Sequence, residues 1–126
     1  MCLKISEYRT NIYKNRKNPI LVYKVVKEVC NKLFSPYQGT LIEINPETLE
    51  FSTNSSLNAE RSFNEYEDGI HAFLLIKRAQ ETFPFRYSEA IIVRAWIYPE
   101  DILGVGSREE KDIVAKRIFF HKEDVE

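Results

Sequence analysis

The chain has 126 residues, which is the usual size of one domain and too short for two. Apolar residues make up 44% and charged residues 29%, a globular balance that excludes a disordered chain. Eighteen basic and nineteen acidic side chains give a formal net charge of −1, so the chain as a whole lacks the positive field that tight, non-specific nucleic-acid binding needs. We therefore expect one domain, residues 1–126, with no strong nucleic-acid signal.

The cysteine count and the N-terminal residues indicate the cellular compartment of the protein. Cys2 and Cys30 are too few for a disulfide scaffold and have no metal-ligand spacing. Charged side chains stand where a signal peptide would have its apolar core, and no apolar run is long enough to cross a membrane. We expect a cytoplasmic protein with no membrane association, no metal and no cofactor.

Two segments rich in β-branched and aromatic residues, 20–29 and 90–98, predict the clearest strands. Shorter apolar runs predict further strands at 33–34, 40–44, 49–51, 69–74 and 113–120. Leu75, Ala79 and Phe83 recur every four residues and predict one short helix over 75–83, which Pro84 ends.

The remaining segments are polar or glycine-rich. They are an irregular lead-in at 1–19, a long polar loop at 52–68, a glycine loop at 104–108 and a charged tail at 121–126. The connections are too short for repeated helical crossovers, so the sheet should be mostly antiparallel. The expected fold is α+β, with about five to six strands and one short helix.

Three arginines are the candidates for binding an anion. Arg94 and Arg117 lie within apolar strands, where a charge needs either a ligand or a partner. Arg108 follows two glycines whose backbone N–H groups could form an anion nest, although a plain flexible connection has the same composition. A guanidinium group recognises phosphate or carboxylate, so the alternative for the strand arginines is a salt bridge within the chain.

Aromatic residues and one histidine complete the candidate ligand site. Tyr37 and Trp96 could stack on a flat ring, although aromatic residues on or beside strands are mostly part of a core. His71 lies mid-strand and could donate a hydrogen bond or act as a base, and its alternative is a buried neutral histidine. No residues form a coherent catalytic set.

Several short motifs together carry a resemblance that covers most of the chain. They are Met1-Cys2-Leu3, Val22-Tyr23-Lys24-Val25, Ser35-Pro36-Tyr37, Gly69-Ile70-His71-Ala72-Phe73 with Ala79, and the strand at 113–120. With these motifs the chain resembles a loosely defined group of small phage-borne and bacterial proteins of unassigned function. Such phage-associated domains include sponges that sequester the nucleotide signals of bacterial defence systems. The resemblance implies nucleotide sequestration, in the host cytoplasm if a phage encodes the chain.

A second resemblance, to a class of enzymes, rests on fewer motifs. A strand with Tyr23-Lys24, a later Gly-Ile-His-Ala-Phe segment and a short helix are similar to the core of ADP-ribosyltransferase-like folds. Those folds need a histidine or arginine on the first strand and a late glutamate, whereas here Tyr23-Lys24 stands at that position and no glutamate is clearly placed. Separately, removal of Met1 would make Cys2 an N-terminal nucleophile beside its own amine.

The leading hypothesis is a non-enzymatic binding domain for a small anionic, nucleotide-like ligand. Its predicted ligand-binding residues are His71, Arg94, Arg108, Arg117, Tyr37 and Trp96. The alternatives are the two enzymes above and an inhibitor that binds a host protein by strand addition at 49–51 or 113–120. The aromatic content of 13% also leaves enough apolar surface for a homo-oligomer.

Overall fold

A computed structural model describes residues 3–30, 32–34, 41–52, 65–66, 69–82, 90–106 and 112–125. Ten strands lie within these ranges: β1 (Leu3–Lys4), β2 (Ile20–Val29), β3 (Lys32–Phe34), β4 (Glu50–Ser52), β5 (Glu65–Tyr66), β6 (Ile70–Phe73), β7 (Ala90–Ile97), β8 (Ile102–Val105), β9 (Asp112–Ala115) and β10 (Arg117–Phe120). The helices are α1 (Glu7–Lys14), α2 (Ile76–Thr82), α3 (Lys122–Val125) and a 3-10 turn, η3 (Pro99–Asp101).

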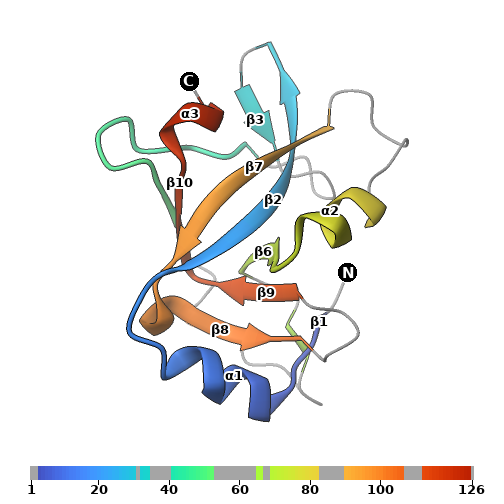
Figure 1. Cartoon of the computed structure of the whole chain (residues 1–126). Helices are drawn as coiled ribbons and strands as arrows, with labels where there is room; N and C mark the ends of the chain where they lie inside the picture. Colours follow the sequence, from blue (N-terminus) through green and yellow to red (C-terminus); the bar gives the residue numbers. More distant parts are fainter. Residues whose placement is uncertain are drawn as a thin grey trace.

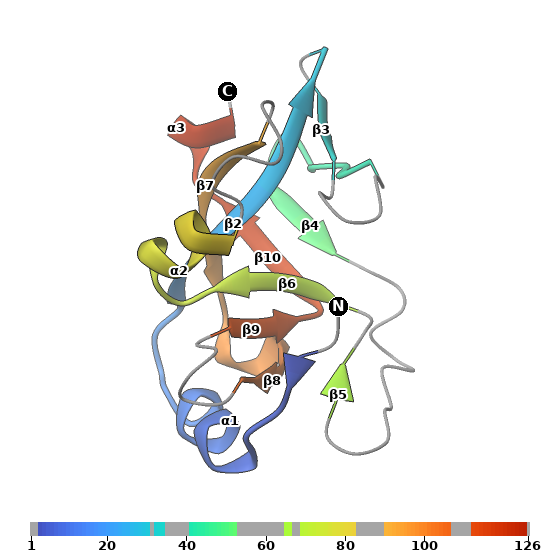
Figure 2. The ribbon, with the colours of Figure 1, turned by 90° about the vertical axis from the view of Figure 1, so that its right-hand side faces the viewer.

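The strands form one large antiparallel sheet and a separate small one. The large sheet has eight strands, in the order β4-β10-β7-β2-β6-β9-β8 with β3 beside β2, and β1 pairs with β5 (Figures 1 and 2). The α+β class and the mostly antiparallel pairing are thus confirmed. The expected five to six strands were too few, because several short strands have little sequence signal.

The large sheet bends over its own core because one segment pairs with different strands at its two ends. β9 pairs with β6 and β8, whereas β10, one residue further along, pairs with β7 and β4. The break falls at Lys116, whose N–H donates to the Asp101 carbonyl at 2.9 Å. A strand that bends in this way can turn the corner between two crossing layers. The segment 113–120 is therefore two strands where the sequence predicted one.

The core lies on the inner side of this bent sheet. Along β2 and β7 alternate side chains face inward, and the two strands pair over their whole common length from Ile20↔Ile97 to Lys27↔Ala90. The fully buried inward residues include Val22, Val26, Val93, Ala95 and Ile97. β-Branched residues suit such a pleated, buried surface, which explains why the sequence identified these two strands correctly.

Helix α1 lies where the sequence predicted an irregular lead-in. Ser6 caps it, because its side chain accepts a hydrogen bond from the Arg9 N–H at 3.2 Å. The helix runs along β8, the last strand of the sheet (Figure 1). Ser6 N–H donates to the Val105 carbonyl, Val105 N–H donates to Thr10 Oγ1, and the Arg9 guanidinium donates to the Gly106 carbonyl. The helix thereby satisfies an edge that would otherwise be open to other chains.

We expect the Thr10→Val substitution to destabilise the protein by about 1–3 kcal/mol, since it leaves the buried Val105 N–H without an acceptor while preserving side-chain shape. Urea denaturation measures the change. Thr48→Val is the matched control, because Thr48 is exposed in a turn and its substitution should have little effect. Equal stability of Thr10→Val and the parent protein would refute the edge-capping role.

Other expectations also changed. The predicted strand at 40–44 is wrong over its described part, where residues 42–44 have no regular structure and Leu41 forms one isolated bridge with Phe34. The predicted glycine loop begins as strand β8, and the charged tail contains α3. The helix predicted over 75–83 is confirmed as α2 over Ile76–Thr82, and Phe83 lies outside the described residues. Ser52 and β5 are the described parts of the predicted loop at 52–68.

Candidate functional site

One outward face of the large sheet carries a row of apolar and aromatic side chains across neighbouring strands. Trp96 on β7 lies directly opposite Leu21 on β2 and Phe119 on β10. Trp96 is 36% exposed and Tyr98, the residue after the end of β7, is 41% exposed. The Tyr98 and Phe119 rings meet edge to face with centroids 5.4 Å apart. We call the outward surface formed by Leu21, Trp96, Tyr98 and Phe119 the aromatic face.

Two of the predicted arginines border this aromatic face. Arg94 precedes Trp96 by two residues and Arg117 precedes Phe119 by two, so strand alternation places both on the outward side. The Arg117 guanidinium lies over the Phe119 ring, 5.5 Å from its centroid. The structure thus brings Trp96, Arg94 and Arg117 together on one face, as neighbours on two paired strands.

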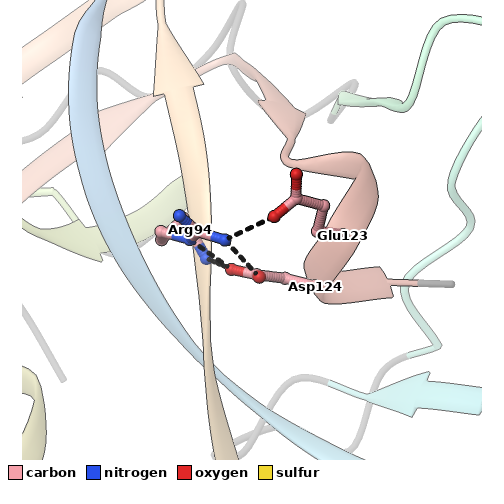
Figure 3. A network of polar contacts seen from close by, with 3 residues as sticks. All are labelled: Arg94, Glu123 and Asp124. Atoms are coloured by element: carbon pink, nitrogen blue, oxygen red, sulfur yellow. Dashed lines mark hydrogen bonds and ion pairs between the residues drawn. The ribbon is translucent and has the colours of Figure 1, made fainter.

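Each of these arginines is nevertheless bound to its own carboxylate. Arg94 donates from Nε and from its backbone N–H to Asp124 Oδ2, at 2.9 and 2.8 Å, and from Nη2 to Asp124 Oδ1 at 2.8 Å. Glu123 Oε2 lies 3.6 Å from the same Nη2 (Figure 3). Both acids belong to α3, so the C-terminal turn is fastened to the middle of β7.

The Arg94–Asp124 contact changes the ionisation of both groups. Its hydrogen bonds raise the pKa of Arg94 and lower the pKa of Asp124 to about 2. Because the folded-state pKa of Asp124 is depressed, the contact stabilises the fold above the ordinary carboxyl pKa of 3.8. This stabilisation is lost as the pH falls toward about 2.

Arg117 is held by a more deeply buried acid. It donates from Nε to Asp101 Oδ2 at 3.0 Å and from Nη2 to Asp101 Oδ1 at 3.3 Å. Asp101 is only 1% exposed, and the hydrogen bonds to it raise the pKa of Arg117. The two guanidinium groups therefore have separate carboxylate partners and do not converge on one position.

The other predicted site residues lie elsewhere or outside the described residues. His71 is half-buried on β6, which β2 separates from β7, and its carbonyl accepts a hydrogen bond from Lys24 Nζ at 2.8 Å. Tyr37 and Arg108 fall outside the described residues, as does Cys2. Of the two segments proposed for strand addition, 113–120 is internal to the sheet, and Glu50–Ser52 lies at its edge.

Three aromatic-face residues were missed by the sequence analysis as site candidates. Leu21 and Phe119 join Trp96 only through the pairing of β2, β7 and β10, whereas Tyr98 follows Trp96 by two residues in the sequence. The alternation that places Trp96 and Tyr98 on one side of the chain was visible in the sequence, but the register of β10 was not. Lys24, which is buried and faces the core between Val22 and Val26, entered the sequence analysis as part of a strand and of the ADP-ribosyltransferase likeness, and its burial was not predicted.

Neither a metal site nor a membrane-spanning helix occurs among the residues that the structure describes. Within them, no three histidine, cysteine, aspartate or glutamate side chains are grouped so that they could hold a metal ion. None of the described helices has the length and apolar character to cross a bilayer. Comparison with known proteins found no matching family model, no matching curated protein and no matching solved structure.

Proposed function

We propose that the chain is a non-enzymatic binding module that holds a flat, nucleotide-like ligand on the aromatic face. The observation that carries the proposal is the half-exposed Trp96 ring with Arg94 beside it on the same strand. Aromatic side chains stack on nucleobases, and each stacked base contributes about 1–3 kcal/mol. The base would lie on Trp96, and its ribose and phosphate would extend toward Arg94.

The charges around the aromatic face restrict the ligand. Arg94 is bonded to Asp124 and lies near Glu123, and Arg117 is bonded to Asp101. A compact, highly charged anion such as free phosphate would meet these carboxylates as well as the arginines. The proposal therefore favours a ligand with a large aromatic ring and low charge, such as a cyclic or linked nucleotide with phosphodiester groups, over a nucleoside triphosphate.

A binding module of this kind would act by sequestration, which is the activity implied by the resemblance to small phage-borne and bacterial proteins, a group that includes nucleotide sponges. The proposal needs no catalytic group, since release of unchanged ligand is its expected end point. Recovery of a chemically altered nucleotide after incubation would instead favour an enzyme.

Isothermal titration against a panel of cyclic, linear and triphosphate nucleotides tests the proposal. We expect a cyclic or linked nucleotide to bind with a Kd below about 1 mM, equivalent to about −4 kcal/mol, and more tightly than any triphosphate. Trp96→Ala should weaken binding by about fivefold or more, because the stacking surface is removed. Ile76→Ala is the control, since Ile76 is an exposed apolar residue on α2, away from the aromatic face, and should not affect this affinity.

Two outcomes would contradict this function. The first is that no nucleotide in the panel binds below about 1 mM. The second is binding that Trp96→Ala leaves unchanged, which would place the ligand elsewhere in the chain.

A further inference from the structure

A second surface, separate from the aromatic face, carries cations whose charge no described acid neutralises. Lys14, Arg16 and Lys17 are exposed at the C-terminal end of α1. Among the described residues none of the three lies within ion-pair distance of a carboxylate, in contrast to Arg94 and Arg117. Between residues 7 and 18 the sole acidic side chain is Glu7, so this stretch is locally basic although the chain as a whole is not.

Two tyrosines of the same helix accompany these cations, and one of them contacts an arginine. The Arg16 guanidinium stacks over the Tyr13 ring, 4.2 Å from its centroid. Tyr8 is 75% exposed, the highest value among the exposed large hydrophobic residues of the described chain, and Ile12 lies one helical turn after it. The helix therefore carries an open ring near its start and leads into a cluster of positive charges at its end, and hydrogen bonds to Val105 and Gly106 hold it in place.

We propose that this surface, formed by Tyr8, Tyr13, Lys14, Arg16 and Lys17, binds single-stranded nucleic acid. Basic side chains that track the phosphate backbone, together with aromatic rings on which unpaired bases stack, are the general features of such sites. Lys14, Arg16 and Lys17 would contact phosphates, and Tyr8 would stack on a base. The complementary charge of the phosphates is what selects this partner.

Two other polyanions fit this surface less well. Insertion at a membrane surface requires a broad apolar helix face, whereas α1 has eight residues and exposes Tyr8 and Ile12 as its large apolar side chains. Double-stranded nucleic acid offers phosphates but keeps its bases paired and stacked, so it would leave the Tyr8 ring unused. This proposal does not depend on nucleotide binding at Trp96, which lies on β7.

Fluorescence anisotropy with a labelled oligothymidylate of about 15 nucleotides tests the proposal on the intact chain. Three phosphate contacts to a single strand predict a salt slope of about −2, so the affinity should fall about 20-fold as salt rises fourfold from about 50 mM. The triple variant Lys14→Gln, Arg16→Gln, Lys17→Gln should lose this binding. The charge-matched control Lys32→Gln, Lys77→Gln, Lys116→Gln, with all three lysines exposed elsewhere, should keep it.

Tyr8→Ala separates stacking from charge. It should weaken oligothymidylate binding by about fivefold or more while leaving the salt slope unchanged. Circular dichroism of each variant confirms that it is folded. The proposal is overturned by absence of binding at the lower salt, by equal loss in the control triple variant, by no effect of Tyr8→Ala, or by equal or tighter binding to duplex DNA or to vesicles of anionic lipid.

Discussion

Replacing Lys24 with methionine should stabilise the protein by about 2 kcal/mol at pH 7, although the substitution removes a hydrogen bond. Lys24 is 8% exposed and lies on the inward face of β2, where burial lowers the pKa of its ammonium group from 10.5 to about 8. Its Nζ donates to the His71 carbonyl at 2.8 Å, and a methionine loses this contact. The free energy gained because no charge is buried should exceed the free energy lost with the hydrogen bond.

The lowered pKa of Lys24 also predicts the direction in which the stability of the parent protein changes with pH. The folded-state pKa of about 8 lies below the ordinary value of 10.5, so between these values the unfolded chain binds more protons than the folded one. The burial cost is therefore fully present below about pH 8, and the stability of the parent protein should rise as pH increases from 8 to 10.5.

Chemical denaturation at pH 7 and at pH 10 measures both effects. The stability advantage of Lys24→Met over the parent protein should shrink at the higher pH. Lys77→Met is the control, because Lys77 is exposed on α2 and its substitution should change stability little at either pH. If Lys24→Met is less stable than the parent protein and has the same pH dependence, burial of the Lys24 ammonium group does not lower the stability of the fold.

Arg117→Met should destabilise the protein by about 3 kcal/mol, because it leaves the carboxylate of Asp101, which is 1% exposed, without its cation. Arg94→Met removes the corresponding contact with Asp124 nearer the surface, where solvent screens the charges, and should have a much smaller effect. The pair of variants compares two bidentate ion pairs on the same face of one sheet. Urea denaturation of both proteins measures the difference.

The comparison also assigns different roles to the two arginines. A large loss for Arg117→Met makes Arg117 a structural residue, whose substitution is unsuitable as a test of ligand binding. A small loss for Arg94→Met leaves Arg94 available for a nucleotide phosphate. If the two variants lose equal stability, the burial of Asp101 is not what distinguishes the ion pairs, and this division of roles is wrong.

The sequence predicted those parts of the fold that local pattern determines. Residues 20–29 and 90–98 became β2 and β7 because β-branched residues fill a buried, pleated surface on their own. Helix α1 was missed because Thr10 is its one buried residue and no apolar stripe marks it. Contacts with β8, nearly one hundred residues away in sequence, hold it in place.

Strand β8 contains Gly104, one of the two glycines from which the sequence analysis predicted a loop. Gly104 and Gly106 suggested a loop, but a Cβ atom at Gly104 would collide with the Ile5 side chain, so this glycine lets the N-terminal segment pack closely on the strand. The bend at Lys116 was likewise invisible, because residues 113–120 have a continuous strand pattern. What divides them is pairing with different partners on each side of the bend.

The candidate site was predictable in its residue types and unpredictable in its arrangement. An arginine inside an apolar strand needs a partner, and the salt-bridge alternative stated for Arg94 and Arg117 is the arrangement that the structure contains. The identity of the partners could not be read from the sequence, because Asp124 reaches Arg94 only after α3 folds back along β7. The aromatic face likewise depends on the register between β7 and β10.

Trp96 is the single tryptophan of the chain, so its intrinsic fluorescence reports directly on the aromatic face. Titration of the intact protein with the cyclic or linked nucleotide that binds best in calorimetry is therefore the most direct measurement of the proposed function. Stacking on the indole ring should quench its fluorescence along a saturable curve whose midpoint matches the calorimetric Kd. Saturable binding by calorimetry with unchanged Trp96 fluorescence would contradict the account, because the ligand would then lie away from this ring.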